Sequence, residues 1–102
     1  MSDALEIVET LPPLHPGEVL RGEFLVPLGL TPYGVAKACK VPRTRIERIV
    51  REEIGITADT ALRLGRYFGV EPAFWLTLQA DFDLQSAQAL SLIHISEPTR
   101  PY

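Results

Sequence analysis

The stretch that decides the fold is TPYGVAKACKVPRTRIERIV, residues 31–50. Each of two segments begins with a signal for a helix start: Thr31 is a capping residue that precedes a proline, and Pro42 opens the second segment. Only Lys40 and Val41 stand between the two segments, so the connection must be a tight turn. The stretch therefore predicts two short helices, one ending near residue 39 and one running from residue 42 to about residue 51.

The apolar residues of this stretch predict how the two helices pack. Ala36 is small enough to allow a close approach, and Val41 is expected to enter the core from the turn. At 100° per residue, Ile46 and Ile49 fall on one side of the second helix and anchor it. This spacing is that of a helix-turn-helix, which braces one helix on the DNA backbone and lays the other in the major groove.

Positive charge is concentrated in the same region. The chain has 102 residues and a net charge of −3, yet residues 37–51 contain six cations and one acid, Glu47. This stretch therefore carries +5 and the remainder of the chain −8. The cations are Lys37, Lys40, Arg43, Arg45, Arg48 and Arg51. A basic island on an acidic chain indicates a polyanionic partner, and the alternative is a solvated, charged helix face.

Three further helices are expected around this pair, which makes the fold all-α with five helices. The first follows a histidine cap at His15 and is closed by Pro27 and Gly29, with an apolar stripe of Leu20, Phe24 and Leu28. The fourth begins after Thr57 and stops at Gly69, with an inner face of Ala61, Leu62, Gly65 and Phe68.

The fifth helix is expected to start at Pro72 and to end in the mid-eighties. Its stripe of Phe74, Leu78 and Phe82 lies beside Trp75, which we expect to be buried against the first or fourth helix. Apolar residues on more than one face of this helix also indicate a partner helix, such as that of a dimer mate.

The chain is long enough for one domain, and 46% of its residues are apolar, which excludes a disordered chain. Residues 1–13 are expected to form an arm, with a short strand at 6–11, and residues 14–88 the helical domain. The tail from residue 89 ends in LSLIHISEPTRPY, which has no helical period and is expected to be non-native sequence.

Several function classes are excluded on the sequence. No stretch is long enough to span a membrane, and no secretory signal is visible, so a cytoplasmic location is expected. The single cysteine, Cys39, cannot build a disulfide or a cysteine-rich zinc site and is expected to be a core residue. No catalytic or metal-binding motif is present, so we expect no enzyme, no cofactor and no metal.

At this point four segments establish a resemblance: HPGEVLRGEFLVPLGL, VPRTRIERIV, GITADTALRLGRYFG and PAFWLTLQADFDL, within residues 14–84. The chain resembles the HigA-type antitoxins of the Cro/λ-repressor-like helix-turn-helix superfamily (XRE family). It departs from the superfamily pattern at Pro32, where glutamine is usual, and at Lys40, where the turn usually has glycine. Residues 51–53 also replace the usual Asn-Gly-basic loop.

The resemblance implies two activities. As a homodimer the protein would bind an operator with an inverted repeat and repress its own operon. It would also neutralise a HigB-type toxin, a RelE-like ribonuclease that cuts messenger RNA. We expect such a toxin to be basic and to dock on the acidic N-terminal arm and first helix. The alternatives are a solitary transcriptional regulator without a toxin, and an interaction module that no longer binds DNA.

Candidate DNA contacts follow from the positions in the motif. Arg43, Thr44 and Arg48 match the positions that commonly meet base edges, where arginine can pair with guanine and the threonine methyl with thymine. The alternative for these three is phosphate contact or a free surface. Candidate phosphate contacts are Thr31, Tyr33, Lys40, Arg45 and Arg51. Glu47 is expected to hold one arginine by pairing along the helix, and the alternative is that it accepts a hydrogen bond from N4 of a cytosine.

Overall fold

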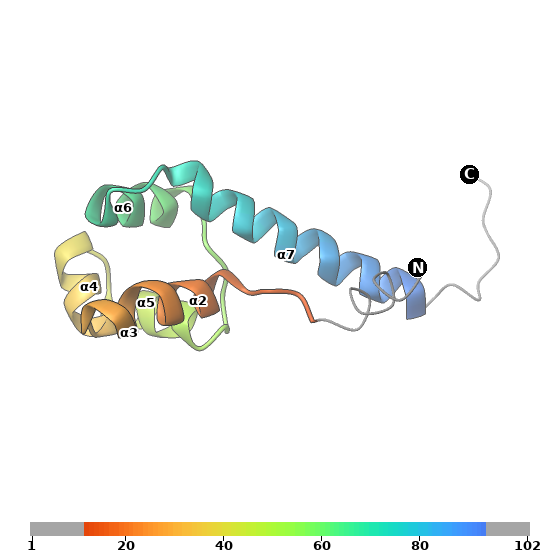
Figure 1. Ribbon diagram of the computed structural model, residues 1–102, viewed down its shortest axis with the longest axis horizontal. Helices are drawn as coiled ribbons and strands as arrows, with labels where there is room; N and C mark the ends of the chain where they lie inside the picture. The colour runs from red at the N-terminus through yellow and green to blue at the C-terminus, as the bar shows by residue number, and fades with distance from the viewer. Residues whose placement is uncertain (1–11, 94–102) are drawn as a thin grey trace.

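The computed structural model describes residues 12–93, and within that range every regular element is a helix (Figure 1). The first helix is continuous and has three parts, followed by four separate helices. This confirms the all-α fold with five helices. The elements are α2 Pro16–Val19, η1 Leu20–Leu25, α3 Val26–Leu28, α4 Pro32–Cys39, α5 Arg43–Val50, α6 Ala58–Phe68 and α7 Pro72–Ile93. The strand expected at residues 6–11 lies outside the described residues.

Side chains cap three of the helix starts as the sequence predicts. His15 Nδ1 accepts a hydrogen bond from the Gly17 amide at 2.8 Å. Thr31 Oγ1 accepts one from Gly34 at 3.0 Å, and the Thr57 hydroxyl accepts one from Thr60 at 3.4 Å. The start of α5 differs from the expectation, because Pro42 is its cap and the helix begins at Arg43.

A widened, π-helical turn, Leu20–Leu25, interrupts the first helix. Pro27 lies just beyond it, and in a regular α-helix its ring would clash with the carbonyl four residues earlier. A π-turn adds one residue to the turn and relieves such a clash. Leu20 and Leu25 are consequently both buried, at 0% and 3% exposed, whereas Leu28 is 59% exposed. The predicted stripe is therefore wrong at Leu28.

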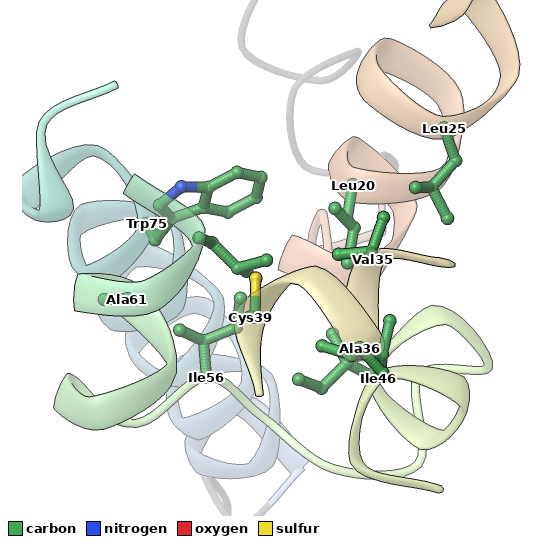
Figure 2. Packing of buried hydrophobic residues seen from close by; sticks show 11 residues of the cluster. Leu20, Leu25, Val35, Ala36, Cys39, Ile46, Ile56, Ala61 and Trp75 are labelled. Carbon is green, nitrogen blue, oxygen red and sulfur yellow. The ribbon is translucent and has the colours of Figure 1, made fainter. Parts of the chain in front are cut away.

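Trp75 is fully buried, as predicted, and belongs to the cluster of buried apolar side chains (Figure 2). Its ring contacts that of Phe24 in the first helix, with centroids 5.1 Å apart. Leu64 supplies the large apolar side chain of α6, while Leu62 is 55% exposed, so the prediction of an inward Leu62 is wrong. The buried cluster is Leu20, Leu25, Val35, Ala36, Cys39, Ile46, Ile49, Ile56, Ala61, Leu64 and Trp75.

Helix α7 continues to Ile93, so the prediction that it ends in the mid-eighties is wrong. Residues 85–93, QSAQALSLI, contain neither glycine nor proline, and nothing in them stops a helix. In Figure 1 the second half of α7 runs away from the other helices. The expected domain boundary at residue 88 therefore lies inside this helix, and the non-native origin of the tail stays a prediction.

Helix α2 approaches the end of α5 closely. A Cβ atom built on Gly17 would lie 1.8 Å from the carbonyl oxygen of Ile49, which is a backbone atom that cannot move aside. Only glycine permits this contact. Gly22, five residues later in the same helix, has nothing within 4 Å of such a Cβ atom.

We therefore expect Gly17→Ala to lower the free energy of unfolding by about 1–3 kcal/mol, because the added methyl forces the backbones apart. Gly22→Ala is the matched control and should raise it by about 0.5–1 kcal/mol, since alanine is the better helix former. Denaturant unfolding measures both. Equal effects of the two substitutions would contradict the close approach.

Candidate nucleic-acid interface

Helix α5 presents its polar face outward because its apolar face is fully anchored. Ile46 and Ile49 are 1% and 0% exposed. On the opposite side Arg43, Thr44 and Arg48 are all exposed, and the two arginine side chains retain 59% and 57% of their accessibility. The structure thus brings the three predicted base-contacting residues together on one exposed face.

The turn between α4 and α5 has the expected tight geometry. Lys40 adopts a left-handed conformation, with φ 60° and ψ 46°, and its side chain is exposed. The amide of Val41 donates to the carbonyl of Ala36 at 3.0 Å, which closes the end of α4. Such a turn ordinarily favours glycine, so the lysine holds a strained backbone position next to the basic face.

The start of α4 lies beside the start of α5. Tyr33 is 55% exposed, and the Cζ atom of Arg43 lies 5.9 Å from the centre of its ring. This cation–π contact joins a predicted phosphate-contacting residue to a predicted base-contacting residue. Thr31 is exposed as well, with its hydroxyl already engaged as the cap of α4.

Each arginine of α5 is paired with a carboxylate. Arg43 Nε lies 3.3 Å from Glu47, which confirms that Glu47 holds an arginine. Arg48 Nε lies 3.5 Å from Glu53, and Arg45 Nη1 lies 2.7 Å from Asp59. Lys40 and Arg51 have no ion pair with any residue in the range 12–93. These two cations, at the two ends of α5, therefore contribute uncompensated charge.

Asp59 joins three helices, which the sequence did not reveal. Its carboxylate accepts from Arg45 and, at 3.1 Å, from Arg63 Nε. Arg63 Nη1 in turn donates to the carbonyl of Cys39 at the end of α4, at 2.9 Å. The hydrogen bond from Arg45, followed by that from Arg63, lowers the pKa of Asp59. The carboxylate is therefore ionised at neutral pH and holds both guanidinium groups.

The far end of α5 is fixed by Arg21, which the sequence reading also missed. Its guanidinium donates to the carbonyl of Val50 at 2.5 Å and to Glu52 at 3.2 Å. Glu52 follows the helix in a left-handed conformation, with φ 64°. No spacing along the chain signals a contact between Arg21 and Val50, which are 29 residues apart.

Other chemistry is sparse in the part of the chain that the structure describes. Cys39 is 7% exposed, which confirms it as a core residue, and burial raises the pKa of its thiol. Residues 12–93 contain no group of three or more His, Cys, Asp or Glu side chains that could hold a metal ion. None of the described helices has the length and apolar character needed to cross a membrane.

Comparison with known proteins places this arrangement in a family. A helix-turn-helix family model matches residues 23–75. Virulence-associated protein I of Dichelobacter nodosus is 54% identical over 78 residues, which are 76% of this chain and 72% of the relative. Antitoxin HigA-1 of Vibrio cholerae is 36% identical over 72 residues, 71% of this chain and 68% of the relative.

Solved structures agree with the comparison of sequences. The Pseudomonas aeruginosa antitoxin HigA with the higBA promoter has a TM-score of 0.80 and 44% identity, covering 87% of this chain and 97% of that one. The antitoxin GraA in complex with its operator has a TM-score of 0.79 and 38% identity, covering 90% and 94%. The chain belongs to the XRE-type helix-turn-helix family, in the group that contains the HigA antitoxins.

Proposed function

We propose that this chain is a DNA-binding antitoxin that represses its own operon and neutralises a HigB-type toxin. The observation that carries the proposal is the exposed basic face of α5, which is anchored from behind by Ile46 and Ile49. A helix seated in this way can enter a major groove as a rigid unit. Similar chains are described as antitoxins with promoter or operator DNA.

Base reading is assigned to Arg43, Thr44 and Arg48. The two arginines can each donate two hydrogen bonds to O6 and N7 of a guanine, and the Thr44 methyl can pack on a thymine methyl. Their exposure supports this role, since each side chain can reach a ligand without moving the helix. The ion pairs of both arginines must open when the bases are contacted.

Backbone phosphates are assigned to Thr31, Tyr33, Lys40, Arg45 and Arg51. Lys40 and Arg51 are the strongest of these, because each is exposed and has no ion pair within residues 12–93. Arg45 must leave Asp59 or share its guanidinium to reach a phosphate. Tyr33 and Thr31 stand at the start of α4, where the positive end of the helix dipole favours an anion.

The protein is proposed to act as a homodimer. Helix α7 carries an exposed stripe of small and apolar residues that a second copy of the helix could cover: Leu76, Ala80, Leu84 and Ala87. Two copies would place their α5 helices in successive major grooves, about 34 Å apart on an inverted repeat. Sedimentation of the purified chain should give the mass of a dimer.

Toxin neutralisation is proposed for the acidic part of the chain. A toxin that cuts RNA is expected to be basic, and outside residues 37–51 this chain carries −8. Glu18 and Glu23 are exposed on the first helix, which follows the N-terminal arm in the sequence. Both activities would take place in the cytoplasm, where promoter DNA and messenger RNA are found, and neither makes this chain an enzyme.

The base-reading assignment predicts different outcomes for different arginines. Arg43→Ala or Arg48→Ala should weaken operator binding by about 1–3 kcal/mol and relax the preference at one base pair per half-site. Arg51→Ala should weaken binding to all sequences alike and reduce the salt dependence. Titrations of operator and random duplexes at several salt concentrations measure both. Equal losses on the two duplexes for Arg43→Ala and Arg48→Ala would overturn the assignment.

The left-handed conformation of Lys40 predicts that a glycine at this position gives a more stable protein that binds DNA less well. Lys40→Gly should raise the free energy of unfolding by about 1 kcal/mol, because glycine adopts φ 60° without strain. The same change should weaken binding to operator and random DNA equally, since one phosphate contact is lost. Thermal unfolding and DNA titration on the same protein separate the effects. A loss of stability would show that the Lys40 side chain supports the fold.

Co-expression with the toxin candidate of the same operon tests the second activity. The two chains should purify together, and deletion of residues 1–13 should weaken capture while operator affinity stays within about threefold, because terminal arms tolerate removal. A chain that binds its operator but captures no toxin would be a solitary regulator. Loss of operator binding on deletion would show that the arm supports the domain.

A further inference from the structure

The arginines of α5 are balanced one for one by carboxylates. Arg43, Arg45 and Arg48 carry +3, and their partners Glu47, Asp59 and Glu53 carry −3. The net charge of this set is zero, although the sequence around it reads as strongly basic. Carboxylates beside these cations lower the positive potential of the face and so weaken its attraction for DNA.

The three acids come from three different places in the chain. Glu47 lies one turn after Arg43 on α5 itself, Glu53 lies in the loop that follows α5, and Asp59 lies in the first turn of α6. Their side chains retain 30%, 48% and 53% of their accessibility. The ion pairs are therefore open to solvent and can be exchanged for pairs with another anion.

We propose that Glu47, Glu53 and Asp59 restrain the affinity for DNA by competing with DNA for the arginines of α5. This inference rests on the proposed DNA-binding function. We refer to the three carboxylates as the acidic set. In the free protein the acidic set holds the guanidinium groups, and any DNA must displace it.

The competition lowers the affinity for both kinds of DNA, because each arginine must leave its carboxylate in either complex. On random DNA an arginine exchanges a carboxylate for a phosphate, with little net gain. On the operator the same arginine gains two hydrogen bonds in fixed geometry with a guanine edge, so it leaves its carboxylate more completely. The acidic set therefore lowers operator affinity at least as much as it lowers the affinity for random DNA.

Stabilisation of the fold does not account for Glu47 and Glu53. Exposed ion pairs contribute little to folding, and Glu47 and Glu53 make no other side-chain contact with residues 12–93 that would require a carboxylate. Asp59 differs, because it also binds Arg63, which in turn holds the end of α4. The two glutamates therefore give the cleaner test, and Asp59 adds to it.

The test compares two triple variants with the same change in net charge. One is Glu47→Gln/Glu53→Gln/Asp59→Asn. The control is Glu23→Gln/Glu71→Gln/Asp81→Asn, which replaces three exposed acids that pair with no cation in the described range. Titrations with operator and random duplexes, each at several salt concentrations, give affinities and salt slopes.

Neutralising the acidic set should raise the affinity for random DNA roughly tenfold, steepen its salt dependence, and raise operator affinity at least as much. The control should change the affinity for random DNA by no more than about threefold, because its three acids pair with no cation in residues 12–93 and release no guanidinium group. Equal effects of the two triple variants, or an operator affinity that does not rise when the acidic set is neutralised, would overturn the proposal. A wild-type chain that binds neither duplex would instead refute the DNA-binding function itself.

Two further variants separate competition for the arginines from loss of folding and from simple repulsion of DNA. If the loss of Asp59 unfolds the protein, Glu47→Gln/Glu53→Gln should still raise random-DNA affinity more than a control with Glu23→Gln/Glu71→Gln. In an Arg48→Ala background, Glu53→Gln should lose at least half of its effect, since no guanidinium remains to be released. An undiminished effect there would show simple repulsion of DNA by Glu53 and would contradict competition.

Discussion

The seating of α5 against the first helix is the constraint on which the rest of the structure depends. Ile49 is completely buried, and its carbonyl oxygen occupies the space that a side chain at position 17 would need. Arg21, one turn further along the first helix, binds the carbonyl of Val50 and so fixes the end of α5. A recognition helix held at its backbone keeps its exposed residues at defined positions, which base reading requires.

Two charged residues with left-handed backbones flank α5: Lys40 before it and Glu52 after it. Each conformation costs about 1 kcal/mol relative to glycine. The charged side chain of each residue has a role: Lys40 adds a cation beside α5 that is unpaired within residues 12–93, and Glu52 accepts a hydrogen bond from Arg21. Both strained backbone positions at the ends of α5 are therefore occupied by charged residues.

Local signals in the sequence predicted much of this fold. The caps at His15, Thr31 and Thr57 and the anchors Ile46 and Ile49 depend on neighbours in the chain, and the structure confirms them. A regular helical period predicts a buried Leu28, but the π-turn ahead of Pro27 shifts the buried position to Leu25. The length of α7 differs from the prediction because residues 85–93 lack an amphipathic period, yet contain no residue that stops a helix.

The candidate site was predicted in its positions but not in its partners. The helical wheel placed Arg43, Thr44 and Arg48 on one exposed face and assigned Glu47 to hold an arginine. The pairs Arg45–Asp59 and Arg21–Val50 join residues 14 and 29 positions apart, and no local pattern encodes them. Asp59 and Arg63 could have been found, since they are spaced four residues apart on α6.

The most direct measurement is the change in backbone amide NMR shifts when a duplex carrying the promoter of the chain's own operon is added. The account predicts that the largest changes fall at the start of α4, on the turn at Lys40 and along α5 to Arg51. Changes confined to α7 or to α3, with α5 unaffected, would contradict the claim that α5 is the helix that reads DNA.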